Sequence, residues 1–274
     1  RSVELTAAAA LGALLASSSG AGPAPLALAL EPCRLENPLG AGTVAARCGS
    51  LEVPENPAEP GGRRLSPAVP VLPAVSTRGR KDPLFLLAGG PGQGAREAFL
   101  PQLGALAGGR RDRDLVLVDQ RGTGASNRLS CDIPEEAWAD AELETQAFAA
   151  LARDCLAELP GDPRFYTTSV AVRDLEAVRA ALGYERINLY GGSYGTRVAQ
   201  HYLRRFPDRA RSVILDAVVP PGLAFGPSMA LDAEAALRAS LARCAADARC
   251  AERFGGLDAA FDALRARLAQ GPVR

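Results

Sequence analysis

The stretch that decides the fold is Ile187–Gly195, which reads INLYGGSYG. Its first four residues have strand character, and the amphipathic segment RVAQHYLRRF follows at positions 197–206, which predicts a strand, a sharp turn and a helix. A helix that packs back over its own strand leaves room only for small residues beside the turn, so glycines on both sides of Ser193 fit this geometry. The pattern predicts Ser193 at the exposed apex of a strained turn, where its hydroxyl is a candidate nucleophile. The alternative is a structural turn that contains an incidental serine.

A second glycine motif, Gly89-Gly90-Pro91-Gly92, follows the apolar segment PLFLLA at positions 83–88. In a hydrolase this loop lies beside the serine turn and offers a backbone N–H to the oxyanion hole. The rival interpretation is a dinucleotide fingerprint over Gly90–Ala95, with Asp119 as the acid that binds the ribose. This interpretation is disfavoured because Asp119 lies further beyond Gly90 than the ~20 residues expected, and because Pro91 has no N–H for a pyrophosphate. It also leaves the serine turn unexplained.

A third motif, DQRGTGAS at positions 119–126, follows the predicted strand DLVLVD. Asp119 and Arg121 stand two positions apart at the strand end, which suggests an ion-paired loop with close backbone approaches. We expect this loop to brace its neighbours rather than to take part in catalysis.

GGPG, DQRGTGAS and GGSYGT occur in this order, each at the end of a predicted strand. Together they resemble the α/β-hydrolase group of proline iminopeptidases and tripeptidyl aminopeptidases, over about Cys33 to Pro221. One departure is Ala88, where relatives often have His before GGPG. The resemblance implies that Ser193 is the nucleophile and that the backbone N–H groups of Gly90 and Tyr194 hold the oxyanion. It further implies release of N-terminal residues from peptides, a helical cap that limits access, and, in exported members, cysteines and a leader.

Strands and helices alternate along the rest of the chain, which predicts βαβ units and a parallel sheet. We expect a first helix at Glu135–Leu159. A second is capped by Thr168 or Ser169 and stopped by Gly183, with Asp174 favouring its positive end. A third helix is expected to end at Pro207. The first two predicted strands suit an antiparallel edge of the sheet. The predicted strands cover Ser50–Val53, Ala68–Val75, Pro83–Ala88, Asp114–Asp119, Ile187–Tyr190 and Ser212–Asp216.

The predicted fold class is therefore α/β, an α/β-hydrolase fold with a mostly parallel sheet and helices on both faces. The sheet is expected to be incomplete at its C-terminal end. Residues 30–220 are the expected hydrolase core, and residues 221–274 are the expected beginning of a helical cap. Within the latter, Met229–Gln270 is rich in Ala, Arg and Leu and has no strand pattern, so it predicts a separate helical layer.

The first 29 residues are typical of a signal peptide. Arg1 precedes the apolar run Leu5–Ala16, and Ala27-Leu28-Ala29 fits an A-x-A cleavage site. The alternative is an Ala-rich tail without structure. The run is too short to span a bilayer, so no membrane span is expected, and the predicted localisation is periplasmic or secreted.

The six cysteines also indicate an oxidising compartment. The chain has no CxxC pair and one histidine, so we expect neither a metal site nor a cofactor. The simplest connectivity pairs neighbours in sequence, although buried free thiols are the alternative. A bridge between the last two cysteines requires the helix to break within Ala245–Arg249, because six residues of one helix turn through about 240°. The six are Cys33, Cys48, Cys131, Cys155, Cys244 and Cys250.

Charge excludes some partner classes. Lys and Arg together number 31, as do Asp and Glu, so there is no electrostatic reason to expect nucleic acid or an anionic membrane. The expected partners are small peptide substrates, and the sequence leaves the oligomeric state open.

The base that a serine nucleophile requires is missing from the pattern. In this fold the acid and then the histidine follow the serine, but the single histidine is His201, ~12 Å further along the predicted helix. Lys81 precedes the GGPG strand at the end away from the turn, and Asp216 has no histidine to orient. The chain alone is therefore expected to be nearly inert.

Two explanations fit this absence. Either the triad Asp and His lie downstream in a longer serine hydrolase, or the chain is a non-catalytic binding module of the same fold. We favour the first, since the predicted sheet lacks its closing strands. The predicted enzyme is an exported exopeptidase, and a carboxylesterase is the alternative chemistry, because a serine turn and an oxyanion hole serve any acyl transfer.

Overall fold

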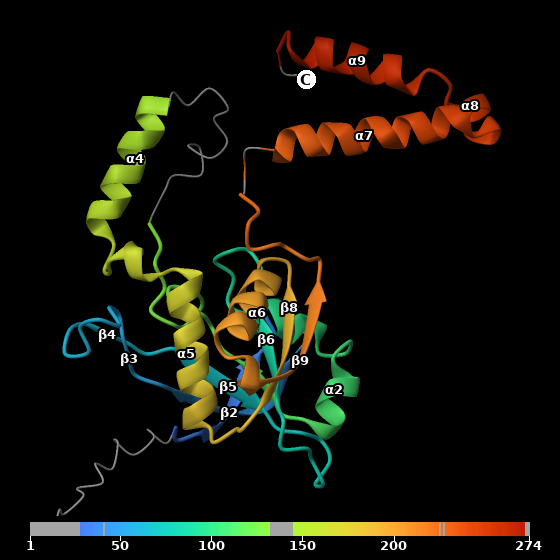
Figure 1. Cartoon of the computed structure of the whole chain (residues 1–274). Helices are drawn as coiled ribbons and strands as arrows, with labels where there is room; N and C mark the ends of the chain where they lie inside the picture. Colours follow the sequence, from blue (N-terminus) through green and yellow to red (C-terminus); the bar gives the residue numbers. More distant parts are fainter. Residues whose placement is uncertain (1–27, 41, 132–144, 225, 227, 272–274) are drawn as a thin grey trace, which may run out of the picture. The chain divides into compact units, whose positions relative to one another are not determined.

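Seven strands form one mixed sheet in the order β1-β2-β5-β7-β6-β8-β9. Figure 1 labels β2, β5, β6, β8 and β9 of this sheet. The structure, a computed structural model, describes residues 28–40, 42–131, 145–224, 226 and 228–271. Strands β7, β6, β8 and β9 run parallel, whereas β5, β2 and β1 continue the sheet in antiparallel pairs. This confirms the α/β-hydrolase fold class and its antiparallel edge. The strands are β1 Glu31–Glu36, β2 Thr43–Ser50, β5 Ala68–Leu72, β6 Leu84–Leu87, β7 Leu115–Leu117, β8 Ile187–Gly192 and β9 Ala210–Asp216, and a separate pair joins β3 Val53–Pro54 to β4 Arg64–Leu65.

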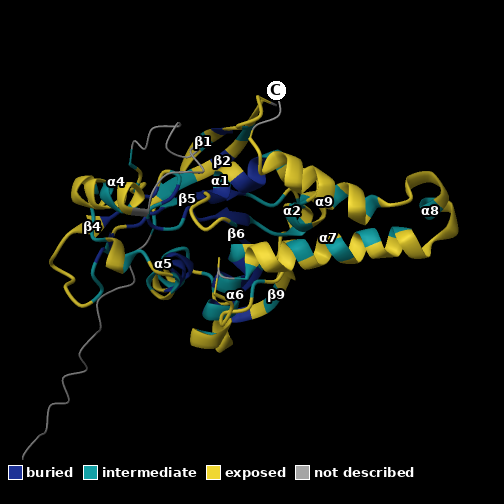
Figure 2. Ribbon diagram, turned by 90° about the horizontal axis from the view of Figure 1, so that it is seen from above, coloured by how far each residue is buried: buried dark blue, intermediate teal, exposed yellow. Residues whose placement is uncertain are grey.

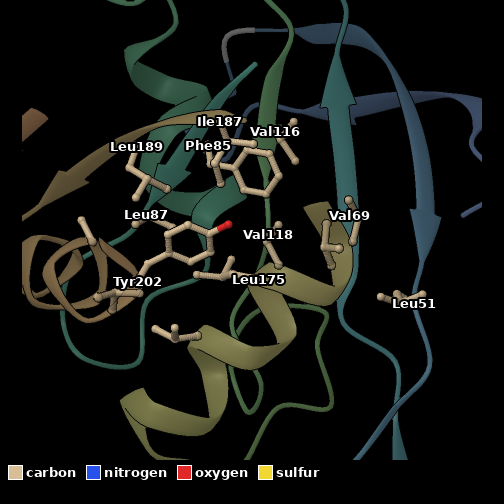
Figure 3. Close-up of a cluster of buried hydrophobic side chains, with 14 of the residues drawn as sticks. Leu51, Val69, Phe85, Leu87, Val116, Val118, Leu175, Ile187, Leu189 and Tyr202 are labelled. Carbon is tan, nitrogen blue, oxygen red and sulfur yellow. The ribbon is translucent and has the colours of Figure 1, made fainter. Parts of the chain in front are cut away.

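Helices cover both faces of the sheet because its central strands are apolar on both sides. Phe85 and Leu87 of β6 point into a core with α5 and α6, in which Tyr202 and Leu175 are fully buried (Figure 3). The alternate residues of β6, with Ala98 and Phe99 of α1, form the core on the other face. The helices of this part are α1 Ala95–Phe99, α2 Ala107–Asp112, α4 Thr145–Glu158, α5 Thr168–Ala181 and α6 Tyr194–Arg205, and the short 3₁₀ helices are η1 Leu100–Gln102, η2 Pro163–Phe165 and η3 Pro207–Arg209.

The first strands differ from the prediction. The expected strand Ser50–Val53 is wrong: β2 ends at Ser50, and Val53 begins the short strand β3. Strand β1 was not predicted, because its sequence EPCRLE buries only Leu35 and has no continuous apolar run. Pairing with β2 holds this edge strand, and a disulfide joins Cys33 to Cys48 across the pair.

Helix α5 also corrects two expectations. Thr167 occupies the N-cap position, so neither Thr168 nor Ser169 caps the helix, and the Thr168 hydroxyl instead bonds the Tyr194 hydroxyl at 2.5 Å. Asp174 lies in the middle of the helix and pairs with Arg121, rather than facing the positive helix end. The predicted stop is confirmed, since Gly183 follows the last turn with φ +75°.

The described residues divide into two compact units, one ending at Val219 and one beginning at Pro220. The second contains three helices, α7 Met229–Ala246, α8 Ala248–Phe254 and α9 Leu257–Leu268, none of which has a buried residue (Figure 2). The predicted helix break is confirmed, because α7 ends before Asp247, whose side chain accepts a hydrogen bond from the Cys250 N–H at 2.9 Å. The roles of the two units as core and cap stay predictions.

The structure pairs all six cysteines in sequence order, as predicted: Cys33–Cys48, Cys131–Cys155 and Cys244–Cys250. Most of the predicted leader, residues 1–27, and the first part of the predicted helix Glu135–Leu159 lie outside the described residues. Leu28 is described, and its backbone N–H bonds the Ala181 carbonyl at 3.1 Å. Within the described part of the chain, no helix is long and apolar enough to cross a membrane.

Candidate functional site

The site forms where the order of the parallel strands reverses. From β6 the chain crosses to β7 on one side and then to β8 on the other, so the carboxyl ends of β6 and β8 lie next to each other. Such a switch point is where open α/β sheets bind their ligands. It brings the loop after β6 to the turn after β8: a Cβ added at Gly89 would lie 3.2 Å from the Ser193 Cβ and 3.6 Å from its Oγ. The two motifs are therefore neighbours, as the sequence predicted.

Ser193 lies at the apex of the turn between β8 and α6. Its backbone has φ 52° and ψ −121°, a left-handed conformation that non-glycine residues adopt only under strain, and its side chain is exposed. The Ser193 N–H donates to the Asp216 carbonyl at 2.8 Å, and the Thr196 hydroxyl donates to the Ser193 carbonyl at 2.7 Å. Both backbone groups of Ser193 are thus held by neighbouring elements while its hydroxyl stays accessible.

The three glycines around Ser193 differ in how much space a side chain would have. A Cβ added at Gly195 would lie 2.0 Å from the Leu87 carbonyl oxygen, and one at Gly191 would lie 2.4 Å from the Gly195 carbonyl oxygen. Since real Cβ atoms do not approach backbone so closely, both positions require glycine. A Cβ at Gly192, by contrast, would have no neighbour within 4 Å. The close packing of α6 over β6 and β8 therefore accounts for two of the three glycines.

Ser193 opens onto a cavity of about 380 Å³. Asp216, at the end of β9, lies in its wall, and the Tyr190 hydroxyl donates to the Asp216 Oδ2 at 2.6 Å. This hydrogen bond raises the pKa of the Tyr190 hydroxyl. The Tyr190 ring meets Phe99 edge to face, with 5.9 Å between the ring centroids. The lining residues are Gly89, Gly90, Gln93, Ala98, Phe99, Gln102, Tyr190, Gly192, Ser193, Asp216 and Ala217.

The two predicted oxyanion donors flank Ser193 from different elements. Gly90 lines the same cavity and has φ +100°. Tyr194 is the first residue of α6, and the first amides of a helix have no partner within that helix. These amides also lie at the positive end of the helix dipole, which favours an anion. That Gly90 and Tyr194 hold an oxyanion stays a prediction.

The loop at 119–126 has the bracing role that the sequence suggested, but with other partners. Asp119 and Arg121 do not pair with each other. The fully buried Asp119 carboxylate accepts hydrogen bonds from the Arg96 and Ala125 N–H groups at 3.2 and 3.0 Å. Arg121 instead forms two 2.7 Å hydrogen bonds to Asp174 of α5, because two residues on a sharply turning loop point in different directions.

No side chain that lines the cavity, among the described residues, is a histidine or a lysine. His201 lies two helical turns beyond Ser193 on the unbroken helix α6. Burial, together with the charges of Arg197 and Arg204, lowers the pKa of its imidazole. Lys81 is exposed before β6. The structure thus places neither candidate base at Ser193, and it shows no cluster of metal-ligating side chains among the residues it describes.

Sequence patterns missed the residues that shape the cavity. Tyr190 was taken only as the last residue of a strand, Asp216 was given no task, and Phe99 lies on a helix that was not predicted. The available signal was positional: Tyr190 lies near the carboxyl end of β8 and Asp216 ends β9, and the carboxyl ends of parallel strands meet at one side of the sheet.

Comparison with known proteins agrees with this geometry. The sequence profile of the alpha/beta hydrolase fold matches residues 82–242. The chain belongs to this family. Within the α/β hydrolases it is similar to serine protease Hip1 of Mycobacterium tuberculosis (strain ATCC 25618 / H37Rv), with 34% identity over 208 residues that cover 69% of the chain and 39% of that protein.

Two further proteins are similar to the chain. Tripeptidyl aminopeptidase of Streptomyces lividans is 35% identical over 191 residues, which cover 64% of the chain and 36% of the relative. Carboxylesterase B of Mycobacterium tuberculosis (strain CDC 1551 / Oshkosh) is 31% identical over 196 residues, which cover 65% of the chain and 37% of that protein. The resemblance to the proline iminopeptidase and tripeptidyl aminopeptidase group is confirmed. The aligned part of the chain spans less than two fifths of the length of these relatives.

Proposed function

We propose that the protein is an exported serine hydrolase, an exopeptidase that releases N-terminal residues from peptides. The observation that carries the proposal is the strained, exposed Ser193 on a strand-to-helix turn, in contact with the glycine loop after β6. Strain of this kind persists only where the surrounding structure imposes it, and it is typical of functional sites. A peptidase is favoured over other hydrolases because Hip1 is a serine protease and the Streptomyces relative is a tripeptidyl aminopeptidase.

In the proposed reaction the Ser193 hydroxyl attacks the carbonyl carbon of a peptide bond. The backbone N–H groups of Gly90 and Tyr194 donate to the oxyanion that forms, and one such donor contributes 10²–10³-fold to kcat in known hydrolases. The tetrahedral intermediate then collapses, the peptide C–N bond breaks, and the amine leaves with the proton taken from Ser193. Water next hydrolyses the acyl–Ser193 ester and restores the Ser193 hydroxyl. The proton of Ser193 requires a base, and since His201 is out of reach, the proposal assigns this step to an Asp–His pair outside the 274 residues.

Export is part of the proposal. It rests on the three disulfides, which persist in oxidising compartments, and on the predicted signal peptide at residues 1–29. The assignment of residues 30–220 to a hydrolase core and 221–274 to the beginning of a cap likewise belongs to the proposal. The division of the chain at Val219 and Pro220 supports it.

The test uses the full-length gene product that contains this chain. Tripeptidyl and aminoacyl anilides are the peptidase substrates, and aryl esters are the esterase substrates. Ser193→Ala is expected to reduce kcat for the anilides by about 10⁴–10⁶-fold, as loss of a serine nucleophile does elsewhere. Ser169→Ala, the same change at an exposed position of α5, is the control and leaves kcat unaltered. A fluorophosphonate is expected to label Ser193, as located by peptide mass spectrometry.

The outcomes separate the alternatives. Turnover of esters without any cleavage of anilides assigns the protein as a carboxylesterase, which the similarity to carboxylesterase B favours as the second candidate. Absence of both activities and of labelling at Ser193 assigns a non-catalytic binding module. Full activity in Ser193→Ala contradicts the nucleophile assignment altogether.

A further inference from the structure

The cavity at Ser193 has an unusual distribution of charge. Of its described lining residues, Asp216 alone carries a charge, and that charge is negative. The others are glycines, apolar side chains, two glutamines, Tyr190 and Ser193. Among these residues Asp216 is thus the one whose charge can attract a cationic ligand.

The Asp216 carboxylate is available to such a ligand. Its side chain is exposed, and within the described part of the chain no Arg or Lys forms an ion pair with it. It accepts one hydrogen bond, at Oδ2, from the neutral Tyr190 hydroxyl. That bond orients the carboxylate without neutralising it, and a carboxylate has further lone pairs for N–H donors. Asp119, two residues after β7, is by contrast 0% exposed and has a guanidinium at 3.5 Å.

Aromatic rings complete the environment. Phe99 and Tyr190 both line the cavity and pack edge to face; Phe99 is largely buried, and Tyr190 is half-buried and hydrogen-bonded to Asp216. Ring faces attract ammonium groups through their quadrupole, most strongly where water is excluded. A carboxylate hydrogen-bonded to a tyrosine in an aromatic wall thus suits an alkylammonium group better than it suits a neutral amide or an anion.

The backbone fixes this group relative to the nucleophile. The Ser193 N–H donates to the carbonyl of Asp216 itself, at 2.8 Å, and β8 and β9 pair up to the residues Gly192 and Asp216. An ammonium group held by Asp216 is therefore held at a set position from the Ser193 hydroxyl.

We propose that Asp216, oriented by Tyr190 and flanked by Phe99, binds the free α-ammonium group of the substrate. The inference rests on the proposed function, because it explains how a serine peptidase of this fold selects the N-terminus of a peptide. The ligand class is a peptide or amino-acid derivative with an unblocked amine. Asp216 here determines specificity, and the reaction itself proceeds at Ser193.

The experiment compares the full-length wild type with Asp216→Asn, which keeps the shape and removes the charge. The first readout is equilibrium binding of phenylalaninamide and of N-acetylphenylalaninamide by calorimetry. We expect the wild type to bind the free amine more tightly, and Asp216→Asn to lose about 10–100-fold in affinity for it, the range for a hydrogen bond to a charged group. The affinity for the acetylated probe stays low in both proteins.

The second readout is selectivity, the ratio of kcat/KM for a free-amine anilide to that for its N-acetyl counterpart. Asp216→Asn is expected to reduce this ratio by about 10–100-fold, mainly through KM. Asp208→Asn, at an exposed acidic residue in η3, is the matched control and leaves both readouts unchanged. Tyr190→Phe, which keeps the ring and removes the donor, is expected to have a smaller effect in the same direction.

The outcomes separate this inference from the proposed function. If anilides are hydrolysed by Ser193 but Asp216→Asn keeps the ratio and the affinity, the ammonium site is wrong and the peptidase stands. If Asp216→Asn lowers kcat/KM equally for free-amine and acetylated substrates, Asp216 supports the reaction at Ser193 rather than binding the ammonium group, and the inference is likewise overturned. If no substrate is hydrolysed, the binding measurement decides alone: a wild type that does not prefer phenylalaninamide contradicts the site.

Discussion

The loop after β7 and the turn after β8 follow the carboxyl ends of parallel strands on the same side of the sheet, yet their polar side chains lie in opposite environments. In the loop at 119–126, Asp119 and Arg121 are buried, and both have charged partners. In the turn at 191–195, Ser193 is exposed, and its side chain makes no cap hydrogen bond to α6. The strain differs as well, because Ser193 is a non-glycine residue at φ 52°, whereas the positive φ angles at 122 and 124 belong to glycines.

The difference distinguishes a loop that stabilises the fold from a turn that presents a reactive side chain. A buried charge without partners is unstable, so the loop after β7 is tied to several distant segments and becomes rigid. Arg121 donates to the carbonyls of Pro54, Glu55 and Phe165 in addition to Asp174. Asp119 of this loop also accepts a hydrogen bond from the Arg96 N–H at the start of α1, just after the glycine loop that lies against Ser193.

The largest expected effect follows from breaking the loop after β7. Arg121→Met removes the guanidinium and leaves the Asp174 carboxylate buried, which is expected to lower the free energy of unfolding by about 3–5 kcal/mol. Burial already raises the pKa of Asp174, and Arg121 opposes that shift. Urea unfolding of the chain, followed by far-UV circular dichroism, measures the loss. Arg64→Met is the control, since Arg64 and Glu52 form an exposed pair whose loss costs about 0–1 kcal/mol. Equal losses in the two variants would show that the loop is no brace.

A smaller effect is expected in the turn itself, and it differs between neighbouring glycines. Gly195→Ala places a Cβ 2.0 Å from the Leu87 carbonyl oxygen, which α6 can relieve only by moving away from β6. We expect a loss of about 1–3 kcal/mol in stability, the range for overpacking, together with a fall in any activity that depends on Ser193. Gly192→Ala has open space and is expected to change stability by less than about 1 kcal/mol. Thermal unfolding of both variants is the measurement, and an equal shift in melting temperature would mean that close packing does not constrain this turn.

Local patterns predicted the turn after β8 well but the loop after β7 only in outline. The strand, the serine and the helix adjoin in sequence, so their geometry follows from glycine sterics and apolar periodicity within one segment. The partner of Arg121, in contrast, is Asp174, 53 residues away, and no local pattern indicates it. Asp119 stands two positions from Arg121, which made it the nearest candidate by sequence and the wrong one.

The same reasoning explains what was missed in the site and at the sheet edge. The cavity combines Phe99 from α1, Tyr190 from β8 and Asp216 from β9, and only the strand order brings them together. Strand β1 depends on its pairing with β2 and on the disulfide Cys33–Cys48, both of which are tertiary. Its own sequence has too little apolar character to indicate a strand.

The smallest expected effect tests the strain at Ser193 directly, and it has the opposite sign. Ser193→Gly removes the steric penalty of φ 52°, about 1–3 kcal/mol, but adds freedom to the unfolded chain worth about 0.4–1 kcal/mol. The net expectation is a gain of about 1 kcal/mol in the free energy of unfolding. Ser169→Gly, the same change in the first turn of helix α5, should instead cost up to about 0.5 kcal/mol, because there glycine relieves no strain and adds freedom to the unfolded chain. Urea unfolding of the two variants compares them under one condition. If both variants are destabilised alike, the turn after β8 holds no strain. It then differs from the loop after β7 only in the exposure of its polar side chain.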